Sequence, residues 1–381
     1  MKRSLKITYV TPVLFGQTLF AHARINLARA FIDRGFEFQF IAPNTPKASE
    51  ILSQKGISHR LYDWLEFPGV STFSKSRGAV RELRNSITEY IPDIIISELR
   101  ITSRKMSSLI GSMRGKKIVW MIDDRSPPVM EGLLGKLQLS HYDFLVPKIV
   151  SNASGIIVQN SQHQDFMKNR FNCDFPDFIN CGGGVDGGRF SPEGKQFEAS
   201  EMVIVYAGSL VRERGILDLF EACKHAIDND FKLKLITMGK GPLSPELEAL
   251  SYEFDWLEHK GLVSDQEYCD SLNLADIGVV PHPDKLAWRI CSPLKMKEYA
   301  ASGLVVIATD LPSHRDLGER DWLRLIDPGN FASEFYNAIK EIAESRSISE
   351  LSESAIRDSA DFSWNKETEE IHNWIMSKVR I

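Results

Sequence analysis

The stretch CSPLKMKEYAASG at residues 291–303 combines a helix start with charged side chains, and the strand-like run LVVIATD follows it at once. Ser292 is a favourable N-cap, and Pro293 suits the first position of a helix. Gly303 is typical of the residue that ends a helix. The sequence therefore predicts a short helix that begins after Ser292, carries apolar residues such as Leu294 on its buried side, and stops at Gly303.

Lys295 and Glu298 would allow the first turns of this predicted helix to bind a sugar phosphate. The free backbone N–H groups of a first helical turn form an anion site, and Lys295 adds a positive charge to it. Glu298 lies one turn deeper, where its carboxylate can accept hydrogen bonds from a pair of sugar hydroxyls. An ordinary capped helix whose Lys and Glu face solvent fits the same residues, and the stretch alone does not decide between the two interpretations.

Two glycine turns, YAGSLVRERG at 206–215 and MGKGP at 238–242, each follow an apolar run. The carboxyl ends of parallel strands meet at one edge of a sheet, where ligands bind. We expect both turns and the helix start to cluster there. Arg212 and Arg214 would add guanidinium groups that can bind phosphate bidentately, although solvated loop arginines are the alternative.

Acidic pairs occur at two further places. Asp123 and Asp124 end an apolar run in WMIDDRSPP, so they are candidates to orient an acceptor or a donor sugar. A turn-capping contact with Arg125 is the alternative. The D-x-D motif at 228–230 is of a type that binds metal. Because it falls between a helix and the next strand, away from the glycine turns, we expect a solvated turn and no metal site.

Alternating strands and helices must position these residues. The first half of the chain shows strand-like runs at 5–10, 36–43, 92–98, 116–123 and 154–161, with a helical pattern at 21–34 that Gly35 ends. Short apolar runs with charged ends are typical of buried parallel strands. The alternation predicts a doubly wound parallel sheet.

A glycine-rich segment at 180–194, with six glycines, separates this half from a second alternation. Strands are expected at 201–208, 232–239, 256–260 and 275–281, and helices at about 215–228, 245–253 and 265–274. The fold class is therefore α/β, with two Rossmann-like doubly wound parallel-sheet domains facing a cleft, where ligands commonly bind. The tail at 330–381 reads as helical, with Trp364 and Trp374 as packing anchors.

Length and composition agree with a two-domain globular protein. The chain has 381 residues, 43% hydrophobic and 25% charged, and two domains are expected at that length. No apolar run approaches the roughly 20 residues of a membrane span. The five cysteines are scattered, so we expect reduced thiols and a cytoplasmic location.

Charge is divided unevenly along the chain. Residues 1–190 hold 25 Lys and Arg against 17 Asp and Glu, whereas residues 191–381 hold 21 against 34, which together give the net charge of −5. Residues 99–122 contain six basic residues and no acidic residue. A solvated helix face and a patch that touches an anionic membrane both fit this segment. Nucleic acid is disfavoured, because no recognised nucleic-acid motif accompanies the charge.

An ordered set of phrases in the second half resembles the retaining glycosyltransferases of family 4. The set is GGGVD (182–186), RF.P (189–192), YAGSLVRERG, LITMGKGP (235–242), KGLVSDQE (260–267), ADIGVVP (275–281) and SPLKMKEYAASGLVVIATD (292–310). The start S-P-x-K resembles that of one subgroup. The resemblance implies the GT-B fold, with an acceptor-binding domain at 1–185, a nucleotide-sugar-binding domain at 186–364 and a last helix at 365–381 that crosses back to the first domain.

The resemblance also implies the role of each site residue. Glu298 matches the glutamate that binds the donor ribose, and Arg214 and Lys295 match the cations beside the diphosphate. With Asp124 they are the catalytic candidates. The donor-binding candidates are Gly16, Gly208, Ser209, Arg212, Gly239, Gly261, Leu262, Ser292, Pro293, Leu294 and Glu298. The base would stack near Gly261 and Leu262. No metal and no cofactor are implied, and the donor is expected to be a UDP- or GDP-sugar.

The chain departs from the family pattern in three places. Ile290 stands where the first of two paired glutamates is usual, which puts the identity of the transferred sugar in doubt. Ser209 stands where an arginine is usual, and Arg212 is the candidate to compensate. The N-terminal glycine pair is reduced to Gly16.

The resemblance therefore implies a retaining, metal-independent glycosyltransferase. It would move a sugar from a nucleotide-diphospho-sugar to a hydroxyl of a glycan or lipid-linked acceptor in surface polysaccharide synthesis. It would work in the cytoplasm or at the inner face of the membrane, with the 99–122 segment touching anionic lipid. A non-catalytic nucleotide-sugar-binding subunit and an epimerase of the same fold that uses His282 remain alternatives. A dehydrogenase is disfavoured, because the first strand lacks a following G-x-G-x-x-G.

Overall fold

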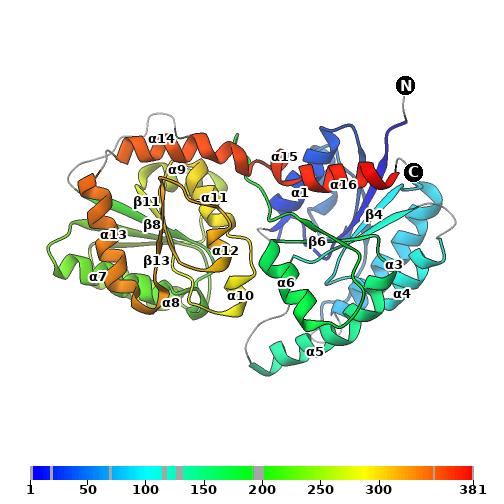
Figure 1. The fold of residues 1–381 in the computed structure, drawn as a ribbon, viewed down its shortest axis with the longest axis horizontal. Helices are drawn as coiled ribbons and strands as arrows, with labels where there is room; N and C mark the ends of the chain where they lie inside the picture. Colours follow the sequence, from blue (N-terminus) through cyan, green and yellow to red (C-terminus); the bar gives the residue numbers. More distant parts are fainter. Residues whose placement is uncertain are drawn as a thin grey trace. The chain divides into compact units, whose positions relative to one another are not determined.

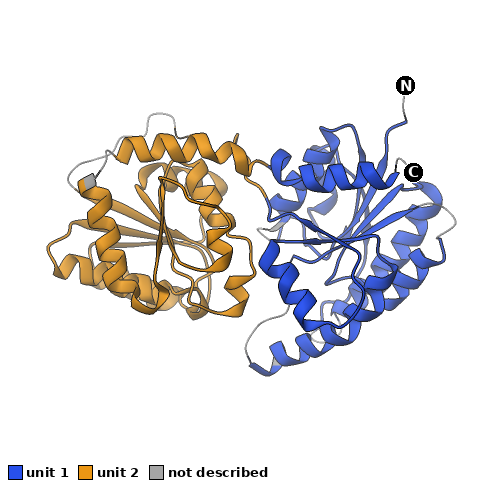
Figure 2. Cartoon of the chain, in the orientation of Figure 1, with its two compact units in different colours: residues 1–183, 364–381 blue, residues 184–363 orange. Residues whose placement is uncertain are grey.

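The computed structural model describes residues 3–17, 20–67, 71–113, 118–125, 132–190, 192, 201–345 and 348–379. The chain forms two compact units (Figure 2): unit 1 holds Met1–Gly183 and Trp364–Ile381, and unit 2 holds Gly184–Ser363. The sequence puts the corresponding divisions at 185/186 and 364/365. Within the described ranges, every helix is too short or too polar to cross a lipid bilayer.

Unit 1 is built on a seven-stranded parallel sheet in the order β3-β2-β1-β4-β5-β6-β7 (Figure 1). The central strands are buried runs of β-branched and aromatic residues, which suit a sheet covered on both faces. The strands are β1 (Lys6–Val10), β2 (Glu37–Pro43), β3 (Ser58–Tyr62), β4 (Ile94–Glu98), β5 (Val119–Asp123), β6 (Gly155–Val158) and β7 (Asp177–Asn180).

Helices cover both faces of this sheet, and each face has its own apolar core. One core includes residues of α1 (Phe20–Ile32), α2 (Ala48–Gln54) and the C-terminal α15 (Trp364–Glu367) and α16 (Glu369–Val379). The other includes residues of α3 (Ser71–Glu89), α4 (Arg104–Gly111), α5 (Gly132–Ile149) and α6 (Ser161–Arg170). Helices α15 and α16 therefore belong to the same unit as the N-terminal strands and helices.

Unit 2 repeats the arrangement on a six-stranded parallel sheet in the order β10-β9-β8-β11-β12-β13. Its strands are β8 (Met202–Ala207), β9 (Leu233–Met238), β10 (Leu257–Gly261), β11 (Ile277–Val280), β12 (Val305–Thr309) and β13 (Leu323–Ile326). One core includes residues of α7 (Ile216–Asp228), α8 (Ser244–Glu253) and α13 (Phe331–Ser345). The other includes residues of α9 (Asp265–Leu274), α11 (Leu294–Ala301) and α14 (Ile348–Ser359). Of two short helices, α10 (Leu286–Arg289) lies between β11 and α11, and α12 (Pro312–Arg315) lies between β12 and β13.

Helix α11 begins later than the sequence predicts. The expectation that Ser292 is its N-cap and Pro293 its first helical residue was wrong: Pro293 is the cap residue, with φ −81° and ψ 62°, outside the helical region. The physical reason is the tight turn from α10, in which the Leu294 N–H donates to the Ser292 carbonyl at 2.9 Å. The predicted end is correct. Gly303 has φ +71° and donates to Ala300, and Leu304 donates to Tyr299, which together form a Schellman motif.

Candidate functional site

Helices α11 and α9 and the turn that contains Arg189 place three polar side chains around one carboxylate. Glu298 is buried on α11, and its Oε2 atom lies 2.7 Å from Lys295 Nζ and 3.0 Å from the Tyr268 hydroxyl. Lys295 Nζ also lies 3.1 Å from the Tyr268 oxygen. On the other side, Arg189 Nη1 lies 3.5 Å from Glu298 Oε1. The sequence-predicted pair of Lys295 and Glu298 is therefore brought together, and the two residues contact each other.

Arg189 and Tyr268 were not among the predicted site residues. Arg189 also pairs with Asp265 at the start of α9, and its guanidinium carbon lies 5.1 Å from the centre of the Tyr268 ring. Burial raises the pKa of Tyr268 well above 10, and the Glu298 charge raises it further. Arg189 stands in the phrase RF at 189–190, within the glycine-rich segment at 180–194, and this phrase was the one signal that could have pointed to it.

The two glycine turns lie side by side at the carboxyl ends of β8 and β9. The Gly208 N–H donates to the Met238 carbonyl at 2.9 Å. Gly239 has φ +138°, and a Cβ there would lie 1.8 Å from the Gly208 carbonyl oxygen, so only glycine allows the two turns to approach this closely. Because β8 and β9 are neighbours in the sheet, their following turns meet at one sheet edge, as predicted.

Arg214 lies against the first of these turns. A Cβ on Gly208 would be 3.5 Å from Arg214 Nη1, and the Arg214 guanidinium carbon lies 5.0 Å from the centre of the Trp288 ring. Burial raises the pKa of Tyr206 to about 12, and the Arg214 charge opposes that rise. The same charge opposes the raised pKa of the Cys291 thiol. Arg214 therefore lies between the glycine turn and the loop that leads into α11.

Arg212 points elsewhere. Its Nη2 atom lies 3.2 Å from Glu246 Oε2 on α8, and both side chains are largely exposed. Ser209 is exposed at the tip of the same turn, where its carbonyl accepts a hydrogen bond from the Tyr206 hydroxyl. The expectation that Arg212 replaces the arginine missing at Ser209 therefore requires Arg212 to leave Glu246.

The end of β10 carries the two residues expected near the nucleobase. Gly261 has φ +64°, and its carbonyl accepts the Gly239 N–H at 2.8 Å, which ties β10 to the second glycine turn. Leu262 follows with 68% of its side chain exposed. An apolar side chain so exposed beside the glycine turn can pack against a flat ring.

A buried aromatic cluster lies close to Arg214. The His282 and Trp288 rings stack with their centres 4.3 Å apart, and the His314 ring lies 5.5 Å from His282. Burial lowers the pKa of His282 well below 6.5, and the His314 and Arg214 charges lower it further. Ile290, which stands where the family usually has a glutamate, is buried and follows Trp288 by two residues in the sequence.

In unit 1, Asp124 is buried and already hydrogen-bonded. Its Oδ2 atom lies 2.7 Å from the Tyr142 hydroxyl and 3.2 Å from His163 Nε2. Asp123 is also buried, and it pairs with Arg125 at 2.7 Å, the contact that the sequence offered as an alternative. These contacts hold both carboxylates within unit 1.

A second buried charge pair stands at the same sheet edge and was missed by the sequence analysis. Arg24 Nε lies 2.6 Å from Glu98 Oε1, which also accepts a hydrogen bond from the Thr11 hydroxyl at 2.6 Å. The Arg24 charge holds the pKa of Glu98 below its usual value, although burial opposes that shift. Arg24 reads as part of an amphipathic helix, so no local signal reveals its buried partner.

Gly16 belongs to unit 1, where it has φ +80°. A Cβ there would lie 3.0 Å from Lys47 Cβ and 3.0 Å from Ile51 Cδ1. Glycine thus allows the loop after β1 to lie against α2. Its predicted contact with the donor stays a prediction.

No cluster of three metal-ligating side chains occurs in the described part of the chain. The D-x-D motif follows α7, with Asp228 as its last helical residue and Asp230 at φ +62°. It precedes β9, whereas the glycine turns follow β8 and β9, so the motif lies at the opposite end of the strands. It is the turn that the sequence predicts.

Comparison with known proteins gives a family match for part of the chain. Residues 201–345 match the family model described as Glycosyl transferases group 1. The matched residues lie within unit 2 and include both glycine turns and α11. A comparison with curated proteins gives no match.

Solved structures resemble the whole chain. Sucrose-phosphate synthase from Thermosynechococcus elongatus is 16% identical, with a TM-score of 0.72 over 99% of each chain. HepE from Anabaena, solved with UDP and glucose, is 16% identical, with a TM-score of 0.69 over 98% of this chain and all of that one. The lipopolysaccharide outer core galactosyltransferase WaaB is 16% identical, with a TM-score of 0.67 over 98% of this chain and all of that one. The predicted fold class, two Rossmann-like parallel-sheet domains of GT-B type, is confirmed.

Proposed function

We propose that this protein is a retaining glycosyltransferase that moves a sugar from a nucleotide-diphospho-sugar to a hydroxyl of a glycan or lipid-linked acceptor. The observation that carries the proposal is the buried Glu298 carboxylate, which Lys295, Tyr268 and Arg189 surround at the start of α11. Glu298, Lys295 and Tyr268 lie within residues 201–345, which match the family model described as Glycosyl transferases group 1. HepE was also solved with UDP-glucose, which supports a UDP-sugar donor here.

Each side chain has a distinct task in this proposal. Glu298 accepts hydrogen bonds from the two ribose hydroxyls, and Leu262 packs against the base. Lys295 and Arg214 stabilise the negative charge that develops on the departing diphosphate, which is where preorganised cations lower a barrier most. The glycine turns bring backbone N–H groups close to the phosphates, because no side chain keeps them apart.

Donor binding exchanges one set of contacts for another. Lys295 and Glu298 satisfy each other at 2.7 Å, so neither is left as an uncompensated charge. A nucleoside diphosphate offers an anion to Lys295 and two hydroxyls to Glu298. The pair can therefore separate without either group losing a partner.

The bond changes in the proposed reaction balance without a metal or cofactor. The bond between the anomeric carbon and the diphosphate oxygen breaks, and the acceptor hydroxyl attacks the same face of the sugar. The hydroxyl proton passes to the departing phosphate. Asp124 stays a candidate for orienting the acceptor or the sugar, although its carboxylate is shared by Tyr142 and His163.

His282 gives little support to the alternative of an epimerase. A group that transfers protons at neutral pH needs a pKa near 7. Burial, the neighbouring His314 ring and the Arg214 charge hold the pKa of His282 well below 6.5. A measurement of donor turnover in the presence of acceptor distinguishes an enzyme from a non-catalytic binding subunit.

The first test is calorimetric binding of UDP, GDP, ADP and CDP, without metal, to the wild type and to Glu298→Ala and Lys295→Met. We expect one nucleotide to bind selectively. Glu298→Ala should weaken the binding of that nucleotide and of its nucleoside about tenfold or more, since hydrogen bonds to a charged group contribute roughly 1.5–3 kcal/mol. Lys295→Met should weaken the binding of the nucleoside diphosphate but leave the binding of the nucleoside nearly unchanged.

Glu353→Ala is the matched control, because Glu353 is an exposed acid on α14 of the same unit. It should bind the nucleotide as the wild type does. If no nucleotide binds, or if Glu298→Ala binds as tightly as the control, the proposed site is wrong and α11 is an ordinary structural helix.

A further inference from the structure

The outer side of α3, α4 and α5 in unit 1 forms a continuous surface, which we call the α3–α5 face. Helix α4 contacts both α3 and α5, and the inner sides of all three helices contribute to one apolar core. The outer residues therefore point away from the sheet. The face is defined by Phe73, Arg77, Val80, Arg84, Arg104, Lys105, Leu109, Leu133, Lys136, Leu137, Phe144 and Lys148.

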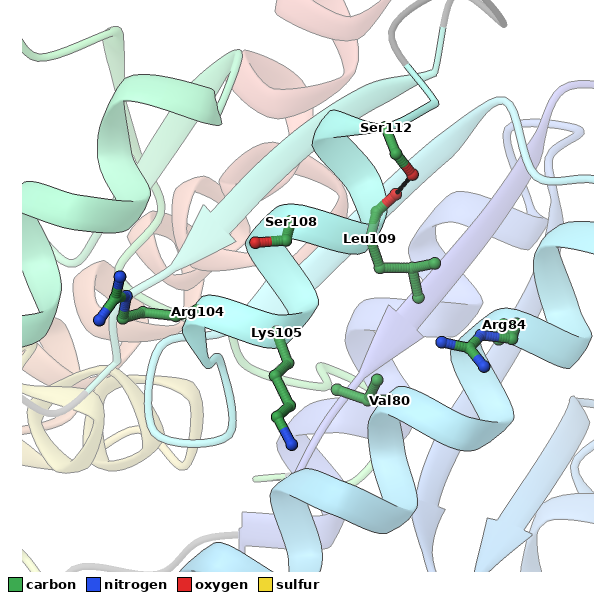
Figure 3. A pocket seen from close by; sticks show the side chains of 7 residues that line it. All are labelled: Val80, Arg84, Arg104, Lys105, Ser108, Leu109 and Ser112. Atoms are coloured by element: carbon green, nitrogen blue, oxygen red, sulfur yellow. Dashed lines mark hydrogen bonds between the residues drawn. The ribbon is translucent and has the colours of Figure 1, made fainter.

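An open pocket of about 750 Å³ lies on this face between α3 and α4. Figure 3 shows Arg84 and Val80 coming from α3, and Arg104, Lys105 and Leu109 coming from α4. Among the described residues, none of the three cations forms an ion pair with a carboxylate, and no acidic residue lines the pocket. The pocket thus offers three cations to an anion from outside the protein.

Helix α5 adds a stripe of exposed apolar side chains. Leu133, Leu137 and Phe144 follow the spacing i, i+4 and i+11, which places them on one side of the helix. They are 75%, 60% and 53% exposed. Lys136 and Lys148 flank the stripe, and Lys148 Nζ lies 3.0 Å from the centre of the Phe144 ring. Large apolar side chains flanked by lysines are the pattern of a helix that lies in a membrane interface.

Helix α3 repeats this combination at its first turns. Phe73 is 60% exposed, and the Arg77 guanidinium carbon lies 5.8 Å from the centre of its ring. The three helices together hold eight Lys and Arg against three acidic residues, a net charge of +5. The three acids are all ion-paired with arginine: Glu82 with Arg60 and with Arg81 of α3, Glu89 with Arg60, and Asp143 with Arg170. The three helices therefore keep a net positive charge after their own carboxylates are counted.

We propose that the α3–α5 face binds the surface of a lipid bilayer that contains anionic lipid. The Leu133, Leu137 and Phe144 side chains enter the interface, and Arg84, Arg104 and Lys105 contact lipid phosphates. Each basic residue near such a surface contributes attraction, and apolar insertion supplies the second signal that stable anchoring needs. A nucleic-acid site would use the cations but would not need an exposed leucine stripe. The inference does not depend on the proposed donor site around Glu298, which lies in unit 2.

The proposed contact refines the sequence interpretation of residues 99–122. Arg104 and Lys105 of that segment lie on the α3–α5 face, whereas Arg114, Lys116 and Lys117 lie outside the described residues. The apolar part of the surface comes from α5, which that segment does not include.

The test is co-sedimentation of the full chain, without nucleotide, with vesicles of phosphatidylcholine alone or mixed with phosphatidylglycerol. We expect binding to the anionic vesicles that weakens at high salt. Arg104→Glu with Lys105→Glu should lower the partition coefficient about thirtyfold, given the attraction that each basic residue contributes. Leu137→Ser with Phe144→Ser should lower it at least about tenfold, because inserted apolar area is lost.

Matched controls come from exposed residues elsewhere. Lys47→Glu with Lys55→Glu changes the same charge next to the other face of the unit 1 sheet, and Tyr252→Ser with Leu274→Ser removes exposed apolar side chains from unit 2. Both controls should sediment with vesicles as the wild type does, and circular dichroism should show that all variants are folded. The proposal is overturned if the wild type does not prefer anionic vesicles. It is equally overturned if the α5 variant binds like the wild type, since the attraction is then that of any basic surface, or if DNA is bound in place of vesicles.

Discussion

At the scale of single residues, the contacts of Glu298 explain how a buried carboxylate is kept in place. An unpaired buried charge is costly, so the protein surrounds it with Lys295, Tyr268 and Arg189. Two of these partners can rotate away, because Lys295 is only partly buried and Arg189 has a second carboxylate in Asp265. The site is therefore organised before a ligand arrives and is able to change partners when one does.

His314 is a residue whose protonation opposes folding. It is fully buried, its Nδ1 atom lies 2.6 Å from the Thr309 carbonyl, and burial lowers its pKa from 6.5 to about 4. Between these two values, the unfolded chain binds a proton that the folded protein does not. Stability therefore falls as pH falls from about 6.5 towards 4.

We expect His314→Asn to reduce this loss of stability. For the wild type, the depressed pKa of His314 should cost roughly 2 kcal/mol of unfolding free energy between pH 7 and pH 5. The measurement is denaturant unfolding of both proteins at the two pH values, with the exposed His225→Asn as the control. Equal pH dependence in His314→Asn and the wild type would show that this histidine does not titrate as its burial implies.

At the scale of elements, α16 shows how the last residues of the chain become part of the first domain. The helix packs against β7 and β5. The Trp374 Nε1–H donates to Asp177 at 2.9 Å, and Trp374 lies directly over Gly155, where a Cβ would be 2.8 Å from the indole. The two predicted anchors, Trp364 and Trp374, both contact the unit 1 core.

Ile375 is the buried residue of α16 best suited to test this packing. It is fully buried in the unit 1 core, so Ile375→Ala should lower the free energy of unfolding of unit 1 by about 2–5 kcal/mol. Asn373→Ala, on the exposed side of the same helix, should change it by less than about 0.5 kcal/mol. Thermal unfolding followed by circular dichroism measures both. A small effect of Ile375→Ala would mean that α16 adds little to unit 1.

The sequence predicts the central elements well, because their patterns are strong. The apolar runs of β1, β4, β5, β8, β9 and β12 and the helices α7, α8 and α9 fall where the sequence places them. The edge strands β3, β7 and β13 were not identified. They are short, and β3 and β7 have charged or half-buried residues, as edges require, so their pattern resembles that of loops.

The part of the candidate site that could be predicted consists of residues close together in the sequence. The glycine turns and the Lys295–Glu298 spacing are local, and the structure brings their elements to one sheet edge. The partners Arg189 and Tyr268 come from distant segments, and nothing near them in sequence indicates that they meet Glu298. Ser292 was misassigned because a favourable cap residue does not reveal that the preceding turn forces ψ of Pro293 out of the helical range.

At the scale of the whole molecule, the apolar residues are divided so that neither unit depends on the other for its core. Two clusters belong to unit 1, and two others belong to unit 2. Each unit has a complete parallel sheet with helices on both faces. Compact units with separate cores can unfold separately, and then one unfolding temperature does not describe the protein.

Calorimetry should therefore show two transitions, of which a bound nucleoside diphosphate shifts only one. A ligand that binds the folded state at about 100 times its Kd stabilises that state by about 2.7 kcal/mol, which corresponds to roughly 5–10 °C for a unit of this size. The residues proposed to bind the nucleotide at the Glu298 cluster lie in unit 2, so the shifted transition should be the one that Ile375→Ala leaves in place. Glu298→Ala should keep both transitions and lose the shift. A nucleotide that raises both transitions equally would show that the two units unfold as one, and that the division of the cores does not divide the stability.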